Sequence, residues 1–220
     1  MSFTMKMITG KIKVVTGLHI GSGSTEMHIG GTDNPVIKNG SEPYIPGSSL
    51  KGKLRSLLCL YAGDENNEKI AKLFGIAADD KVNKDKAEEL KTSRLSFWDC
   101  FITDEWRKNI LNRQIDFTEV KMENTIDRAT GTSKNLRNTE RVIPETEFNF
   151  KLTLKVFDND EDLQQVVLGA LKLLEMDSLG GSGSRGYGKV KFIDLKIDGT
   201  DIQSTFDAIK PFEDKDKRFI

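Results

Sequence analysis

The feature that most restricts the fold is a strict alternation of apolar and polar residues in FNFKLTLKV, residues 148–156. The apolar positions of this segment are Phe148, Phe150, Leu152, Leu154 and Val156. Because successive side chains of a strand point to opposite faces of a sheet, the pattern predicts a strand with one buried face. The other face carries Asn, Lys and Thr and is expected to meet solvent.

Two long helices are predicted from apolar residues at helical spacing. The first follows Pro46 and Gly47, with Ser48 or Ser49 as its N-cap. Its expected inner face consists of Leu50, Leu54, Leu57, Leu58 and Tyr61. The second covers residues 160–177 and ends at the glycines of LGGSGSRGYGK, residues 179–189.

Further strands are predicted at residues 3–16, 94–101 and 189–197. The order strand, helix, extended middle, strand, helix, strand is that of a ferredoxin-like β-α-β-β-α-β unit. We therefore expect a single α+β domain over residues 1–220 with two insertions. One insertion, at about residues 63–92, is helical and charged, and the other, at residues 118–147, is a long hairpin with its tip at Gly131.

The composition limits the classes of partner. Hydrophobic residues make up 37% of the chain and charged residues 30%, which is ordinary for a soluble domain. Since the formal net charge is −1, a nucleic acid would have to be held by a local basic strip. No apolar run is long enough for a signal peptide or a membrane span, so we expect a cytoplasmic location and no membrane partner. Cys59 and Cys100 are expected to be buried free thiols.

Three segments are candidates for binding a sugar–phosphate backbone. The start of the first helix combines free N–H groups with basic side chains, and Lys51 and Arg55 flank one edge of its apolar stripe while Lys53 flanks the other. Glycines let the loop at residues 180–189 approach a ligand closely, and the hairpin offers cations in an extended arm. A solvated helix face, a flexible connection and a solvated hairpin are the simpler alternatives. The candidate residues are Ser48, Ser49, Lys51, Lys53, Arg55, Arg128, Lys134, Arg137, Arg141, Gly181, Gly183, Arg185 and Lys189.

The loop at residues 17–36 is a candidate for catalysis because it carries Asp33 among Gly, Ser and Thr residues. A carboxylate there could bind a divalent cation or orient a hydroxyl, although an Asp-Asn-Pro turn is the simpler explanation of the residue and the one that its chemistry alone favours. His19 and His28 share the loop without zinc-ligand partners. His19 could stack on a base or bond a phosphate, or it could be structural.

Residues 183–189 also match GxxxxGK, the opening of a nucleotide-binding loop. Val190 stands where that motif needs Ser or Thr for magnesium, and the loop leads into a strand where the motif requires a helix. A nucleotide hydrolase is therefore not expected.

Five segments occur in this order: GLHIGSG (17–23), DNPVI (33–37), EPYIPGSSLKGKLRSLL (42–58), TEVKMENTIDR (118–128) and LGGSGSRGYGKV (179–190). Together they resemble the RAMP (repeat-associated) proteins of CRISPR systems, and within them the backbone subunits of type III-A complexes. The resemblance runs from the first strand to about Leu195. Leu136 departs from it, standing where a proline is expected, and SRLSFWD at residues 93–99 is a loose version of the usual strand.

The resemblance implies an RRM-like ferredoxin core whose copies stack into a filament on a guide RNA, beside other subunits of the complex. The basic residues of the first helix and residues 181–189 would line a groove for the guide, and the hairpin would be a thumb that wedges into the guide–target duplex. The family's catalytic aspartate falls on Asp33, with Pro35 two residues on. Asp33 would cut target RNA by holding a divalent cation, with Mg²⁺ expected, or by orienting the 2′-hydroxyl. A non-catalytic RNA scaffold is the alternative.

Overall fold

The structure is a computed structural model of the whole chain. It describes residues 2–23, 32–76, 90, 92–158, 160, 162–213 and 220. His28, most of the charged segment expected around residues 78–91, and residues 214–219 of the charged tail lie outside the described residues.

A five-stranded antiparallel sheet forms the centre of the molecule, with the strand order β10-β9-β1-β8-β4. The longest strands are β1 (Phe3–Val14) and β8 (Glu147–Phe157), which pair along almost their whole length. The strands β9 (Val190–Ile197) and β10 (Thr200–Asp201) lie beyond β1, and β4 (Leu95–Phe97) lies beyond β8. The strands predicted at both ends of the chain are therefore confirmed.

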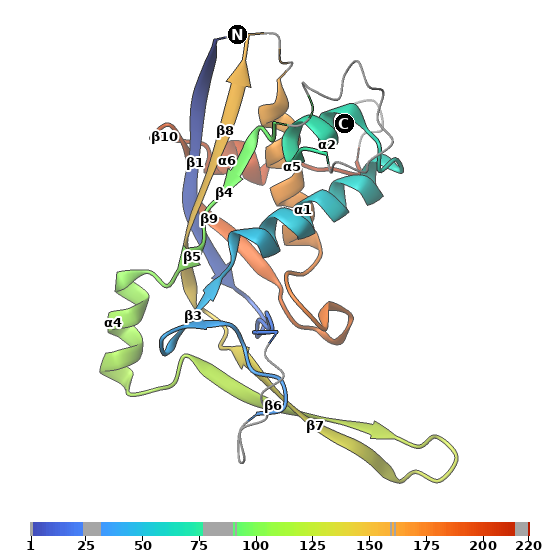
Figure 1. Cartoon of the computed structure of the whole chain (residues 1–220). Coiled ribbons are helices and arrows are strands. Elements are labelled where there is room, and N and C mark those ends of the chain that lie inside the picture. The colour runs from blue at the N-terminus through green and yellow to red at the C-terminus, as the bar shows by residue number, and fades with distance from the viewer. Residues whose placement is uncertain are drawn as a thin grey trace.

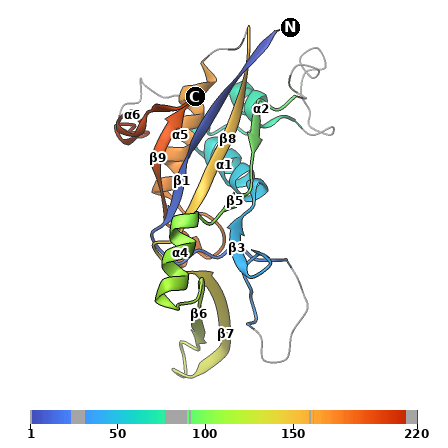
Figure 2. The same ribbon diagram turned by 90° about the vertical axis from the view of Figure 1, so that its left-hand side faces the viewer.

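One face of this sheet is covered by α1 (Gly47–Ala62) and α5 (Leu163–Met176), as Figures 1 and 2 show. Both helices contribute buried leucines to the same core as the apolar side chains of β8. Phe148 and Leu152 are fully buried there, while Lys151 between them is exposed. The alternation in β8 is thus confirmed as a strand with one buried face, which contributes to the main apolar core together with the two helices.

The start of α1 differs from the prediction of a serine cap. The N-cap is Pro46, and neither Ser48 nor Ser49 provides a side-chain cap. The carboxylate of Asp99 instead accepts the N–H of Gly47 (2.8 Å), and Ser49 N–H donates to Pro46 O (3.0 Å). A carboxylate of the chain therefore occupies part of the site that the sequence suggested for phosphate.

The strand predicted at residues 94–101 is divided between two sheets. Its first part is β4, while β5 (Cys100–Phe101) pairs with β3 (Glu42–Ile45), which in turn pairs with β2 (Lys38–Asn39). The helix α4 (Asp104–Arg113) follows β5 and was not predicted. Because Ile110 is its only buried residue, this helix has almost no apolar periodicity to detect.

A short helix and a two-stranded ribbon lie within the two segments that the sequence predicted as insertions. The insertion contains a short helix, α2 (Glu68–Phe74), packed against α1. The hairpin is a ribbon of β6 (Thr118–Ile126) and β7 (Ser133–Val142) that projects from one end of the molecule (Figure 1). Gly131 lies in its connecting turn with a φ of 68°.

The shorter elements near the end of the chain were not predicted. They are η1 (Gly183–Arg185) within the glycine-rich loop and α6 (Gln203–Asp207) after β10. Within the described part of the chain, the helices are all too short or too polar to cross a membrane.

Candidate nucleic-acid interface

The glycine-rich loop is attached to the β6–β7 ribbon through Tyr187, which is only 1% exposed. Its hydroxyl donates to Glu123 Oε1 (2.9 Å), and its ring lies 4.5 Å from Lys121 Nζ and 5.0 Å from the Arg141 guanidinium. Burial and the neighbouring Glu123 carboxylate raise the pKa of Tyr187 to about 12. The tyrosine is therefore neutral and fixes the loop against the root of the ribbon.

Glu123 is the second anchor, because it also accepts from Arg185 in the loop (3.1 Å). The Tyr187 hydroxyl, followed by Lys121 and Arg185, holds the pKa of Glu123 below its usual value. This single carboxylate thereby keeps an arginine of the loop and a lysine of the ribbon close together.

A polar hollow of about 550 Å³ extends from the Glu123–Arg185 contact along the ribbon toward its turn, where Ile126, Arg128 and Asn135 line it. It brings together three of the predicted cations, Arg128, Arg137 and Arg185, although Arg185 is far from the others in sequence. Lys121 lines the same hollow and was not a candidate, since it belongs to a strand that shows no distinct basic motif. Four cations around one carboxylate, Glu123, leave an excess of positive charge that suits a phosphate chain.

Two other cations of the ribbon are engaged by the protein itself. Arg141 Nε contacts Glu119 Oε1 (2.7 Å), and its aliphatic part lies where a side chain on Gly17 would have to be. Lys134 pairs with Asp127 in the turn (2.5 Å). Arg141 therefore supports the root of the ribbon, and Lys134 supports its tip.

The glycines bring the loop against His19. A side chain on Gly180, whose φ is 77°, would lie 2.2 Å from His19 O, and Gly181 N–H donates to the same oxygen (2.8 Å). His19 Nδ1 in turn donates to the main-chain oxygen of Glu140 (2.7 Å). His19 thus has a structural role between the loop and β7.

The cations of α1 lie on two sides of the helix, as the helical wheel predicted. Lys53 Nζ contacts Asp177 (2.6 Å) at the start of the glycine-rich loop. Lys189 and Gly183 line a shallow hollow with the same aspartate. The Lys53 edge of α1 is therefore the one that adjoins this loop.

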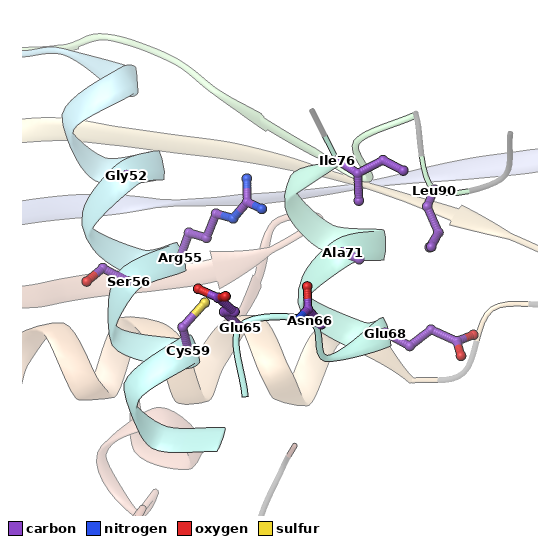
Figure 3. A pocket seen from close by; sticks show the side chains of 10 residues that line it. All are labelled: Gly52, Arg55, Ser56, Cys59, Glu65, Asn66, Glu68, Ala71, Ile76 and Leu90. Carbon is purple, nitrogen blue, oxygen red and sulfur yellow. The ribbon is translucent and has the colours of Figure 1, made fainter. Parts of the chain in front are cut away.

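Arg55 lies about 200° around the helix axis from Lys53, given 3.6 residues per turn. It lines a different hollow, of about 480 Å³, between α1 and α2, with Cys59 and Glu68 (Figure 3). Arg55 and Arg185 therefore do not share one hollow, and the expected groove is divided. Ser48 is exposed, whereas Ser49 and Lys51 are partly buried.

Asp33 is exposed and lies beside the ribbon. Its Oδ2 accepts the main-chain N–H of Asn138 in β7 (3.1 Å), and the next residue, Asn34, forms a bridge with Thr139. Among the described residues, no group of three or more His, Cys, Asp or Glu could hold a metal ion. One exposed carboxylate nevertheless fits Mg²⁺, which keeps most of its waters and is often bound by one or two carboxylates and by phosphates of the substrate.

The fold and the site together define a mixed α/β protein with a cationic hollow between the glycine-rich loop and the outer part of a projecting ribbon, toward its turn. The model of the RAMP superfamily matches residues 11–191, and the chain belongs to this family.

Relatives in several organisms are similar over most of the chain. The chain is 40% identical over 210 residues to the "CRISPR system Cms endoribonuclease Csm3" of Methanothermobacter thermautotrophicus, covering 87% of this chain and 84% of the relative. It is 42% identical over 209 residues to the protein of the same name from Streptococcus thermophilus, covering 89% and 90%. The protein of that name from Mycobacterium tuberculosis is 39% identical over 222 residues, covering 89% of each.

Two solved structures share the fold. A chain of the type III-A Csm3–Csm4 subcomplex superimposes with a TM-score of 0.55 at 28% identity, covering 88% of this chain and 77% of that one. A chain of the type III-B Cmr-beta complex bound to cognate target RNA superimposes with a TM-score of 0.63 at 16% identity. In the second case the match covers 88% of this chain and 60% of the other.

Proposed function

We propose that the protein is an RNA-binding backbone subunit of a type III-A CRISPR effector complex that cuts target RNA paired to a guide. The observation that carries this proposal is the cationic hollow between the ribbon and the glycine-rich loop, with an exposed carboxylate, Asp33, on the edge of the same ribbon. The relatives named CRISPR endoribonucleases, at about 40% identity over most of the chain, support the same activity.

We infer that the core is ferredoxin-like and RRM-like. Support comes from the strand order β9-β1-β8-β4, with α1 between β1 and β4 and α5 between β8 and β9 in the chain. These are the connections of a β-α-β-β-α-β unit. The segment around α2 and the ribbon are then insertions into this unit, at the positions expected of them.

In this proposal the RNA is held by its backbone. Arg128, Arg137 and Arg185 face the phosphates, and guide–target pairing supplies the choice of sequence. The ribbon acts as the thumb that enters the duplex between subunits. Further copies of the chain and other subunits of the complex are the protein partners, consistent with the Csm3–Csm4 subcomplex that shares the fold.

Cutting requires that a 2′-hydroxyl of the target lose its proton to water and that its oxygen lie in line with the adjacent phosphorus. A bond from this oxygen to phosphorus then forms as the P–O5′ bond breaks, which leaves a 2′,3′-cyclic phosphate and a 5′-oxygen that takes up a proton from water. Distortion by the ribbon supplies this geometry. Asp33 then orients the hydroxyl or holds the metal, and the two roles remain alternatives. A bound Mg²⁺ would supply charge stabilisation at the phosphoryl group.

The test uses the assembled complex and a guide-matched RNA. We expect Asp33→Ala to abolish cutting while target binding stays near that of the unmodified complex, and a chelator to abolish cutting by the unmodified complex. The matched control is Asp116→Ala, which removes an exposed carboxylate between α4 and β6 and should cut normally.

Normal cutting by Asp33→Ala would favour the alternative, a non-catalytic scaffold. Loss of target binding in this variant would make Asp33 a structural residue. Cutting that continues in the chelator would remove the metal from the proposal and leave the 2′-hydroxyl role.

A further inference from the structure

Residues 33–36 run along the outer edge of β7, away from β6. Asn138 N–H donates to Asp33 Oδ2 (3.1 Å), and Asn138 O accepts from Asn34 N–H (3.3 Å). Glu140 N–H then donates to Asn34 O (3.0 Å). The loop that carries Asp33 is therefore attached to the ribbon almost as a third strand would be.

The side chain of Glu140 strengthens this attachment. It is 7% exposed, and its Oε2 accepts the N–H of Val36 (2.9 Å). Its Oε1 accepts from Lys38 Nζ (2.6 Å) and from the Thr118 hydroxyl (2.7 Å). Burial opposes ionisation, but Lys38, Thr118 and Val36 together keep the pKa of Glu140 below its usual value. A buried carboxylate with this many donors is a rigid anchor.

The same strand is also connected to the glycine-rich loop. Glu140 O accepts from His19 Nδ1, and His19 O accepts from Gly181 N–H (2.7 and 2.8 Å). The ribbon, the loop beside the cationic hollow and the segment with Asp33 therefore meet at Asn138 and Glu140. These are alternate residues of β7 whose main-chain groups point away from β6. These hydrogen bonds form a continuous connection from the glycine-rich loop through β7 to Asp33.

We infer that the outer edge of β7 positions the Asp33 carboxylate through the main-chain N–H of Asn138, so that the seating of the ribbon on RNA sets the geometry for cutting. The inference rests on the function proposed above. An exposed aspartate rotates about two side-chain bonds, and a charge-assisted hydrogen bond from a fixed main-chain donor restricts that rotation. Asn138 is in this sense a positioning residue, since it acts through Asp33.

The test removes the main-chain N–H donor of residue 138, which contacts Asp33. In Asn138→Pro the donor is lost, and because this N–H points away from β6 no bond between the two strands is lost with it. Asn138→Ala keeps the donor and is the matched variant. We expect Asn138→Pro, in assembled complexes at saturating target, to cut about ten- to a hundredfold more slowly, as small misplacements at reacting centres do. Target affinity should stay within about threefold, since RNA contacts are unchanged, and Asn138→Ala should cut within about threefold of the unmodified complex.

A second variant covers the case in which the proline prevents assembly. Asp33→Glu keeps the charge but moves it by one methylene from the Asn138 N–H, and it should slow cutting by about tenfold or more with unchanged affinity.

The outcomes distinguish the positioning role of Asn138 from the proposed nuclease function. Cutting at the normal rate by Asn138→Pro, or by Asp33→Glu, would overturn the positioning role while leaving the nuclease proposal intact if Asp33→Ala is inactive. Equal losses in Asn138→Ala and Asn138→Pro would assign the effect to the side chain and also overturn it. An active Asp33→Ala complex would overturn the proposed function itself.

Discussion

Replacing Tyr187 by phenylalanine tests whether the glycine-rich loop is fixed to the ribbon. The ring would keep its contacts with Lys121 and Arg141, but the hydrogen bond to Glu123 Oε1 (2.9 Å) would be lost. Glu123 would keep its contacts with Arg185 (3.1 Å) and Lys121 (3.4 Å). The variant therefore removes one bond to a charged acceptor and little else.

The size of the effect follows from this geometry. A hydrogen bond to a charged group contributes about 1.5–3 kcal/mol when buried, and we expect about 1–2 kcal/mol here because two other donors and solvent reach Glu123. For a chain of this length that corresponds to a fall of about 2–8 °C in Tm. The measurement is thermal unfolding of the isolated subunit followed by circular dichroism.

The pH dependence of this difference has a definite sign. The pKa of Glu123 is lowered in the folded protein, so its contribution to stability is present above the unfolded pKa and is lost as the pH falls through the folded value. The gap in Tm between the unmodified protein and Tyr187→Phe should therefore be full at pH 7 and shrink below about pH 4, near the unfolded pKa of Glu. It should not shrink up to pH 9, because the pKa of Tyr187 is raised to about 12.

A double-mutant cycle with Glu123→Gln completes the test. A coupling free energy of about 0.5 kcal/mol or more between positions 123 and 187 is expected for residues in contact. Equal Tm values for Tyr187→Phe and the unmodified protein, with no coupling, would refute the reasoning that this bond fixes the loop.

Three further predictions concern RNA binding, the core and the thiols. Replacing Arg137 and Arg185 by glutamine should lower the slope of log affinity against log salt by about one to two for guide RNA of any sequence, and an unchanged slope would remove the hollow from the RNA path. Phe148→Ala should destabilise the isolated subunit by about 3–5 kcal/mol in urea unfolding, because this ring is fully buried in the main core; a loss below about 1 kcal/mol would contradict its central place. Burial raises the pKa of Cys100 to about 12, so iodoacetamide at pH 8 should modify the partly exposed Cys59 first, and mass spectrometry would reveal the reverse order.

The regular elements could be predicted where burial alternates in a simple pattern. β8 and α5 each bury one face in a single core, so their periodicity is visible in the sequence. The helix α4 could not be found in this way, because Ile110 is its only buried residue, and the signals that remain are its Thr103 cap and its acidic first turn. The cap of α1 was predicted wrongly because its partner, Asp99, is 52 residues away.

The residue types of the site could be predicted from the sequence, but the hydrogen bonds that join its distant segments could not. Glycines and cations in the loop and the ribbon indicated a polyanion, and the RAMP resemblance indicated Asp33. No local sequence pattern distinguishes Glu140, because its hydrogen-bond partners Val36 and Lys38 are 104 and 102 residues away in the sequence. Tyr187 was included only as part of a glycine-rich run, although it is the residue that joins this run to the ribbon.

The carboxylate that caps α1 also limits how this helix can meet a nucleic acid. Asp99 accepts the N–H of Gly47, so the positive end of the helix dipole already has a negative partner belonging to the protein. A phosphate drawn to that end would face repulsion from a fixed anion. Any contact of α1 with RNA must therefore come from the sides of the helix, through the long side chains of Lys51, Lys53 or Arg55. These side chains can change conformation as the RNA strand moves.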